Sequence, residues 1–197
     1  MKNKIEEEKT LVLIKPDGVK RGLVGEVISR IEKRGLKIIA LEMIWATKEQ
    51  VDGHYPKDEE WLKRIGEKTL ENYRKYGINA KEELESEDPL KIGNKVRGWI
   101  LDYMTSGPMV KAVVQGIHAI EMVRKIVGST IPSQAEMGTI RGDFSVDDAT
   151  VANREKRAIH NLIHASENEK EADHELKFWL SPEEIHYYRR AEDDIMI

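Results

Sequence analysis

The sequence predicts a single α+β domain in which a β-sheet is covered on one face by helices. Short apolar segments of strand length alternate with longer segments in which apolar residues recur at helical spacing. Their order is strand, helix, strand, helices, strand, helix, loop, strand, helix. The chain has 197 residues, of which 40% are hydrophobic. That is enough for one domain with a substantial core, or for one domain carrying a large insertion.

A buried first strand is predicted at residues 10–14, where a continuous apolar run is too short for a helix. Lys15-Pro16-Asp17-Gly18 then turns the chain, because proline fixes one backbone dihedral and glycine permits a positive φ. Apolar residues at helical spacing predict a helix over residues 24–33, which Gly35 ends.

A long second strand is predicted at residues 36–45. Thr47 and Gln50 form a capping box that begins a short helix. Residues 57–94 then change to a dense mixture of Lys, Glu, Tyr and Trp, which we interpret as an inserted helical excursion. We expect this insertion to be too small to bury a core of its own.

The second half of the chain returns to the first pattern. Residues 96–104 have helical spacing, residues 109–116 form a third apolar strand, and residues 119–126 carry a helical stripe that stops at Gly128. After a further loop, residues 145–157 form a second charged excursion, which we interpret as an extended loop before the last strand.

The last strand is a short apolar run, Asn161-Leu162-Ile163-His164-Ala165-Ser166, that delivers one histidine to a strand end. Ser166 is predicted to cap the helix over residues 169–179. A histidine at a strand-to-helix junction is held rigidly and can still reach a cleft. An ordinary packed or surface histidine is the competing interpretation. Ser181-Pro182 begins a final short helix.

Composition excludes several classes of protein. The net charge of −4 provides no global basic field to recruit nucleic acid. The absence of cysteine excludes disulfides, thiol catalysis and cysteine-ligated zinc. The charged N-terminal segment lacks the apolar stretch of a signal peptide, and no run approaches the ~18 apolar residues of a membrane span. We therefore expect a cytoplasmic protein.

Three basic residues are candidates for binding phosphate. Lys15 follows a buried strand at the rim of the sheet, Arg124 lies in an otherwise apolar helical stretch, and Arg141 lies between two glycines. A solvated surface position is the alternative for Lys15 and Arg124. A structural pair with Asp143 is the alternative for Arg141.

Common nucleotide and metal motifs are missing. The sequence has neither GxxxxGK[ST] nor GxGxxG. His160 and His164 are four residues apart, which in a strand places both on one face, so a metal-binding pair stays open.

Five motifs follow one another along the chain. They are Lys15-Pro16-Asp17-Gly18 with Arg21-Gly22-Leu23-Val24-Gly25, His54-Tyr55, Ser106-Gly107-Pro108, Gly138-Thr139-Ile140-Arg141-Gly142-Asp143-Phe144, and Asn161-Leu162-Ile163-His164-Ala165-Ser166. In this order they resemble the nucleoside diphosphate kinase family over residues 8–55, 98–144 and 158–184.

The resemblance implies a ferredoxin-like βαββαβ fold, with an antiparallel sheet covered by helices. It also implies a ping-pong reaction in which a nucleoside triphosphate gives its γ-phosphate to His164, and the phosphohistidine passes it to a nucleoside diphosphate. Imidazole suits this role because much of it is unprotonated near its ordinary pKa of about 6.5.

The resemblance also assigns roles to residues. Glu175 and Ser166 hold the His164 ring from behind, Tyr55 supports the phosphate end, and Asn161 with Lys15 takes ribose hydroxyls. The side chains expected to bind phosphate oxygens are Lys15, Arg124, Thr130 and Arg141. Mg²⁺ is the expected cofactor, held mainly by the nucleotide phosphates rather than by protein ligands.

The chain departs from the family pattern opposite the nucleotide base. A Pro-Phe-Phe-like segment usually follows the His-Tyr pair, and one Phe stacks on the base; here Val96-Arg97 aligns with that segment, behind the insertion at residues 57–94. Arg97 is therefore the candidate for stacking on the base. Trp61, Tyr73 and Tyr76 are the alternatives, unless these aromatics pack the insertion onto the core.

Two other classes of protein could use the same fold: a non-catalytic regulatory or binding protein, and a histidine phosphocarrier that accepts phosphate from another protein. The complete set of phosphate-handling positions favours the kinase. The expected partners are nucleoside di- and triphosphates and further copies of the chain, as a hexamer or tetramer. Residues 1–197 are expected to form one domain, with no nucleic-acid or membrane partner.

Overall fold

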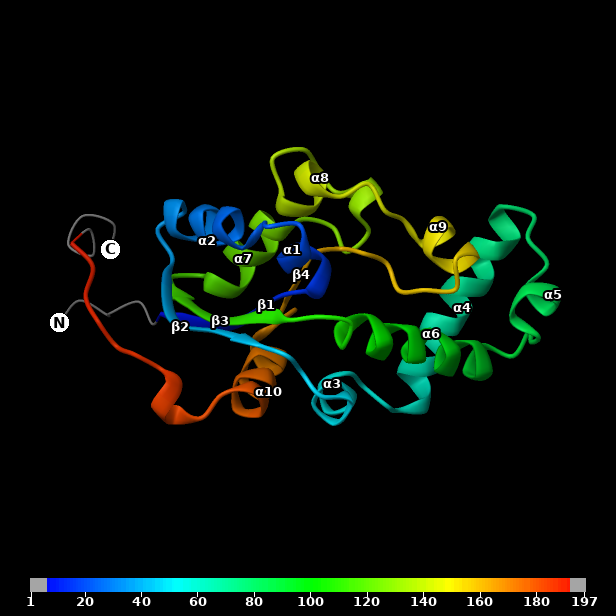
Figure 1. Cartoon of the computed structure of the whole chain (residues 1–197), viewed down its shortest axis with the longest axis horizontal. Coiled ribbons are helices and arrows are strands. Elements are labelled where there is room, and N and C mark those ends of the chain that lie inside the picture. Colours follow the sequence, from blue (N-terminus) through cyan, green and yellow to red (C-terminus); the bar gives the residue numbers. More distant parts are fainter. Residues whose placement is uncertain (1–6, 192–197) are drawn as a thin grey trace.

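The computed structural model describes residues 7–191. Its core is a four-stranded sheet in the order β2-β3-β1-β4, in which all neighbouring strands are antiparallel (Figure 1). The strands are β1 (Glu8–Ile14), β2 (Lys37–Ile44), β3 (Met109–Gly116) and β4 (Ile163–Ala165). This order and the helical connections confirm the predicted ferredoxin-like α+β fold.

Ten α-helices and two 3₁₀ helices connect the strands of residues 7–191. They are α1 (Pro16–Lys20), α2 (Val24–Lys33), α3 (Lys48–His54), α4 (Glu59–Lys75), α5 (Ala80–Leu84), α6 (Pro89–Met104), α7 (Ala119–Val127), η1 (Pro132–Gln134), α8 (Ile140–Phe144), α9 (Ala149–Arg154), α10 (Glu169–Trp179) and η2 (Pro182–Glu184). No helix in this part of the chain is both long and apolar enough to cross a membrane.

Helices cover both faces of the sheet. Val12 and Ile14 of β1 pack in one apolar cluster with α2 and α7, whereas Leu11 and Leu13 pack in a second cluster with α3, α6 and α10. In Figure 1, α2 and α7 lie above the sheet, α3 and α10 lie below it, and α6 extends to its right. The expectation of a sheet covered on one face was therefore wrong. The continuous apolar run of β1 is the pattern of a strand buried on both sides.

The chain turns after β1 as predicted, but it does so through the short helix α1, and Gly18 does not have the positive φ that we expected. A side chain at Gly18 would place its Cβ 2.9 Å from Ile14 and 3.0 Å from the carbonyl oxygen of Leu162, so only glycine fits this turn. Gly35 has a φ of 87° immediately after α2. The capping box of Thr47 and Gln50 begins α3.

The insertion contains its own small core, contrary to expectation. α4, α5 and the first part of α6 bury Tyr73, Ala80, Leu84 and Ile92 against one another. Residues 82–88 include the end of α5. They lie at the far end of the molecule from the sheet (Figure 1).

The strand that carries the histidine is shorter than expected. Leu162 has a φ of 69°, which breaks the extended backbone, and β4 begins only at Ile163. His160 therefore does not share a strand face with His164, and the metal pair of these two residues is not formed. The predicted cap is also displaced by two residues, because the side chain of Asn168 caps α10.

Candidate active site

His164 lies on the edge strand β4, directly opposite Leu13 of β1. Its side chain is half-buried, and its Nε2 lies 2.8 Å from Oε1 of Glu175. Nε2 is shielded from solvent, yet its alignment with Glu175 falls outside hydrogen-bond geometry. Such contacts often tighten only when substrate binds. No group in residues 7–191 forms a hydrogen bond with the other ring nitrogen, Nδ1. This nitrogen is therefore available for chemistry.

Glu175 is held from behind by Ser166. Oε2 of Glu175 accepts a hydrogen bond of 2.6 Å from the Ser166 hydroxyl, whose oxygen accepts one of 3.3 Å from the backbone N–H of Leu11. Both side chains are buried. Burial raises the pKa of Glu175. The structure thus brings Glu175 and Ser166 to His164, in the arrangement that the family resemblance implies.

His54 is the nearest residue that the sequence reasoning did not include in the site. Its ring packs edge-on against His164 at 4.7 Å. Its Nδ1 accepts a hydrogen bond of 3.2 Å from Nε1 of Trp179 and lies 3.5 Å from Oε1 of Glu175. Burial lowers the pKa of His54 to about 3, so the ring is neutral. The signal was present, because His54 is half of the His54-Tyr55 motif.

His54, His164 and Glu175 also form a group of potential metal ligands, whose donor atoms lie within 4.8 Å of one another. Hydrogen bonds already engage this group, from Trp179 to His54 and from Ser166 to Glu175. We interpret it as a set of side chains that orient the His164 ring. His160, by contrast, is exposed and packs against Tyr103 at 5.0 Å.

Tyr55 ends α3 and packs edge-on against His54 at 4.8 Å. Burial, followed by the negative charge of Glu175, raises the pKa of Tyr55, so its hydroxyl keeps its proton. The structure therefore brings Tyr55 into the neighbourhood of His164, as expected.

Lys15 and Asn161 form the centre of the basic part of the site. Nζ of Lys15 donates a hydrogen bond of 2.7 Å to Oδ1 of Asn161, and Nδ2 of Asn161 donates one of 3.0 Å to the carbonyl oxygen of Thr130. Burial, together with the positive charge of Arg141, lowers the pKa of Lys15 to about 7. A buried lysine that already contacts a polar side chain is no longer an ordinary solvated surface residue.

Arg141 is buried and holds three backbone carbonyl groups. Its Nε donates to Asn161 at 3.0 Å, Nη1 to Gly128 at 2.8 Å and Nη2 to Ile163 at 2.5 Å. The alternative pair with Asp143 does not form, because Asp143 binds Arg30 at 2.7 Å. A guanidinium has five N–H donors, so two remain for a ligand.

Arg124 and Thr130 are both exposed. The charge of Arg124 is one of the causes that lower the pKa of Arg141 and that of His164, so its guanidinium lies near the site. It forms no ion pair with any carboxylate of the described chain. Burial and the charge of Lys15 are the larger causes that lower the pKa of His164, so this ring is neutral at pH 7.

Arg97, the candidate for stacking on the base, is bonded to residues at the end of α3. Its guanidinium donates to the carbonyl oxygens of Asp52 and Pro56 and forms an ion pair of 2.7 Å with the Asp52 carboxylate. Among the alternatives, Tyr73 is buried in the insertion and donates its hydroxyl to the carbonyl oxygen of Asn153 at 2.9 Å. It packs the insertion, as the competing interpretation held. Trp61 lies on α4 and Tyr76 directly follows that helix, in the same insertion.

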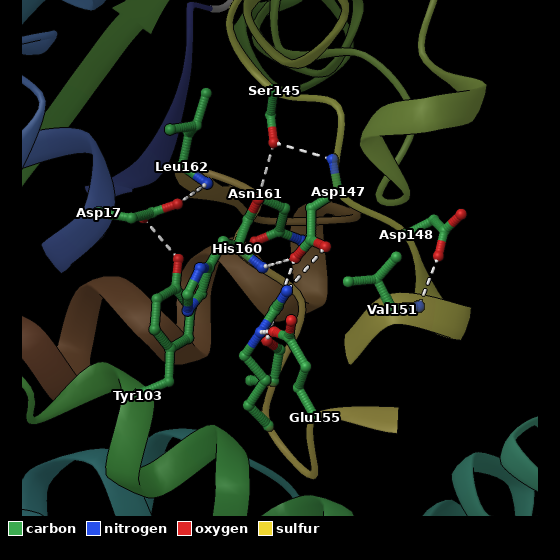
Figure 2. A network of polar contacts seen from close by, with 12 residues as sticks. Asp17, Tyr103, Ser145, Asp147, Asp148, Val151, Glu155, His160, Asn161 and Leu162 are labelled. Carbon is green, nitrogen blue, oxygen red and sulfur yellow. Dashed lines mark hydrogen bonds and ion pairs between the residues drawn. The ribbon is translucent and has the colours of Figure 1, made fainter. Parts of the chain in front are cut away.

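A polar network holds the chain just before His164 (Figure 2). Asp17 accepts a hydrogen bond of 2.5 Å from the Tyr103 hydroxyl and one of 3.1 Å from the backbone N–H of Leu162. The carboxylate therefore supports the positive φ of Leu162. Asp17 belongs to the first motif, but its role was missed because its partners are distant in sequence.

A cavity of about 240 Å³ lies away from this site. It is lined by residues of β2, β3 and the C-terminal segment, including Lys111, Glu184 and His186. Lys111 is already neutralised there by Glu42 at 2.8 Å and Glu184 at 2.5 Å. We therefore place the reactive site at His164 on its chemistry rather than at this cavity.

Comparison with known proteins agrees with the geometry. A family model described as nucleoside diphosphate kinase matches residues 8–65 and 93–185, and leaves out a central part of the insertion. A nucleoside diphosphate kinase of Pyrobaculum aerophilum is 48% identical over 178 residues, covering 90% of this chain and 97% of that protein. One from Pyrococcus furiosus is 38% identical over 188 residues, covering 95% of this chain and 92% of that protein.

Two solved structures are also similar. An NDP kinase from Pyrobaculum aerophilum superposes with a TM-score of 0.89 at 46% identity, covering 92% of this chain and all of that one. A transition-state mimic of nucleoside-diphosphate kinase from Borrelia burgdorferi, with bound vanadate and ADP, has a TM-score of 0.76 at 33% identity. That comparison covers 94% of each chain.

Proposed function

Because the chain belongs to the nucleoside diphosphate kinase family, we propose that it transfers the γ-phosphate of a nucleoside triphosphate to a nucleoside diphosphate through a phosphohistidine on His164. The observation that carries this proposal is the state of the His164 ring. Nε2 faces Glu175 at 2.8 Å, Nδ1 is available, and the lowered pKa keeps the ring unprotonated and nucleophilic.

In the first half-reaction, the Nδ1 lone pair of His164 attacks the γ-phosphorus in line. The bond from the γ-phosphorus to the bridging oxygen breaks, and the nucleoside diphosphate leaves with that electron pair. Nδ1 has no proton to lose, because the neutral ring carries its proton on Nε2, which lies 2.8 Å from Glu175. The carboxylate thereby stabilises the positive charge that develops on the ring. The second half-reaction runs these steps in reverse with a different nucleoside diphosphate.

The other site residues act by placing charge around a loose, anionic transition state. Lys15, Arg141 and Arg124 supply positive charge, and Thr130 adds a hydroxyl. Asn161, which is bonded to Lys15, is placed to take ribose hydroxyls. Tyr55 donates a hydrogen bond at the phosphate end of the nucleotide. We assign Arg97 a supporting role at α3, because the partners described above engage its donors.

The carboxylates of the site fit an Mg²⁺ ion that is carried by the nucleotide rather than by the protein. Asp17 is engaged by Tyr103 and Leu162, and Glu175 by Ser166, so neither carboxylate is free to ligate a cation. The phosphates would hold the ion instead, in keeping with its reluctance to dehydrate. When bound, the ion neutralises part of the phosphate charge.

The test is to incubate the protein with ATP labelled at the γ-phosphate, remove nucleotide, and add GDP. Label is expected on the protein in an acid-labile form, and is then expected to move to GTP. His164→Asn must abolish both steps. His118→Asn is the matched control, because this exposed residue has a φ of 53°, which asparagine tolerates. Transfer by His164→Asn would overturn the proposal.

We further propose that the protein is a homo-oligomer, a hexamer or a tetramer. This is supported by Leu41 and Met43 of the edge strand β2 and by Trp45 directly after it, which are 54%, 60% and 67% exposed. Light scattering after gel filtration should show the oligomer, and Met43→Glu should dissociate it. We place the protein in the cytoplasm because its sequence contains no cysteine and its substrates are nucleotides.

A further inference from the structure

Residues 145–157, which we expected to be an extended loop, contain the helix α9 and are bonded to the chain just before His164 (Figure 2). The backbone N–H of His160 donates a hydrogen bond of 2.7 Å to the Asp147 carboxylate. The carbonyl oxygen of His160 accepts one of 2.8 Å from the Ser145 hydroxyl. Both polar groups of the His160 backbone are therefore held by residues 145–157.

The residue after His160 is the one that organises the phosphate-binding side chains. Oδ1 of Asn161 accepts from Lys15, its Nδ2 donates to the carbonyl oxygen of Thr130, and its own carbonyl oxygen accepts from Arg141. A displacement of the Asn161 backbone would disturb all three contacts together. Residues 145–157 and the phosphate-binding residues are thus coupled through the backbone of His160, which is covalently joined to Asn161.

We propose that Asp147 is a positioning residue for nucleotide binding, which fixes Asn161 and, through it, Lys15 and Arg141. The inference rests on the proposed function, because it specifies how that site is held. Asp147 also bridges to the Thr130 side of the site, since its carbonyl oxygen accepts a hydrogen bond of 3.2 Å from the backbone N–H of Ser133.

Asp147 is itself held in place by Arg157. The guanidinium donates to both carboxylate oxygens, at 2.6 Å and 3.1 Å. This bidentate geometry is the strongest form of such a pair. Burial alone would raise the pKa of Asp147, but the hydrogen bonds from Arg157 and from the His160 N–H outweigh it and lower the pKa. The carboxylate therefore stays ionised at neutral pH.

The insertion at residues 57–94 supports the ion pair between Asp147 and Arg157. α9 connects Asp147 to Arg157 and packs against α4. The Tyr73 hydroxyl donates a buried hydrogen bond of 2.9 Å to the carbonyl oxygen of Asn153. The backbone N–H of Arg157 donates to Ala152 at 3.0 Å. A continuous path of contacts therefore runs from the insertion to Asn161.

Asp147 contacts none of the groups that orient His164, which are Glu175, Ser166 and His54. Its loss should therefore weaken nucleotide binding without altering the reacting ring. We expect Asp147→Ala to raise the KM for nucleotides by about tenfold, while kcat stays within about threefold. Tyr73→Phe, which acts from further away, should raise KM by about twofold to threefold.

Asp148→Ala is the matched control. Asp148 is the adjacent residue and caps α9 through the backbone N–H of Val151, but it does not bond to His160. Its KM should stay within twofold of the parent value. Asp147→Asn keeps an oxygen that accepts from His160, so its KM should lie between those of the parent and Asp147→Ala. This variant also covers the case in which Asp147→Ala fails to fold.

The proposal fails if Asp147→Ala and Asp148→Ala raise KM equally, or if the Asp147 variants lower kcat at an unchanged KM. The yield of labelled phosphate on the protein at saturating ATP distinguishes a failure of the Asp147 proposal from a failure of the proposed kinase function. That yield depends on His164 and should be unchanged in Asp147→Ala. Its absence from the parent protein would instead refute the kinase itself.

Discussion

Glu175 places Oε1 of its carboxylate 2.8 Å from Nε2 of His164, inside the protein, and its other oxygen accepts the Ser166 hydroxyl. This contact selects between the two ring nitrogens. The nitrogen that faces a buried carboxylate keeps its proton, so the other nitrogen carries the lone pair. In the proposed mechanism, the nucleophilic atom is thus selected by a residue on α10 that need not touch the substrate.

Glu175→Gln should lower kcat by about tenfold to a hundredfold and change KM little. Glutamine preserves the size of the side chain but removes the negative charge that stabilises the ring as it gains positive charge. The measurement is steady-state kinetics with saturating donor and acceptor nucleotides. Glu169→Gln, on the exposed first turn of the same helix, should behave as the parent protein. Equal effects of the two substitutions would contradict the role of Glu175.

His164 should remain neutral well below the usual pKa of a histidine. Burial and the charge of Lys15 lower the pKa of His164 to about 3, so the ring stays neutral as the pH falls from 7.5 to 5. Two-dimensional NMR of the histidine ring resonances measures this directly, with His164→Asn used to assign the signal. A titration midpoint near 6.5 for the assigned resonance would show that the ring is not shielded in this way.

The strands and most helices could be predicted from the sequence because their signals are local. β1 is a continuous apolar run, α2 has apolar residues at helical spacing, and Thr47 with Gln50 caps α3. The covering of both sheet faces was missed, although the continuous apolar run of β1 is the pattern of a strand that is buried on both sides. The early break in β4 was missed because the φ of Leu162 is supported by Asp17, which lies 145 residues away in the sequence.

For the site, family motifs identify which residues matter but not what each one contacts. Arg141 was expected to reach the ligand, and the structure shows that most of its bonds hold backbone carbonyls. Arg97 was proposed opposite the base from alignment alone, yet its donors are used at the end of α3. Asp147 lies outside every motif. Its partners, His160 and Arg157, come together only in three dimensions.

The KM for nucleotides should rise with pH above about 7.5. Burial, followed by the charge of Arg141, lowers the pKa of Lys15 from 10.5 to about 7, so Lys15 in the free protein loses its proton as the pH rises through this range. A bound phosphate raises that pKa again, so each binding event takes up a proton, and log KM should rise by up to about one for each pH unit. kcat should stay level, since the bound state remains protonated.

The control for this pH dependence is Lys15→Arg, because arginine keeps its charge throughout the range. Its KM is expected to be higher than that of the parent at pH 7, owing to the different geometry, but independent of pH from 7 to 9. If the KM of the parent is equally flat over that range, Lys15 is not the group that titrates.

Two glycines of α6 should respond to alanine in opposite directions. A Cβ at Gly93 would lie 2.0 Å from the backbone carbonyl oxygen of Leu62 in α4, whereas a Cβ at Gly98 would meet nothing within 4 Å. Gly98→Ala should therefore stabilise the protein by roughly 0.5–1 kcal/mol, the gain in helix propensity. Gly93→Ala gains the same propensity but must separate two helix backbones. A net loss of about 2 kcal/mol or more is expected, because rigid overpacking outweighs propensity. Urea unfolding of both variants measures the difference, and a Gly93→Ala protein as stable as the parent would mean that α4 and α6 are not in backbone contact.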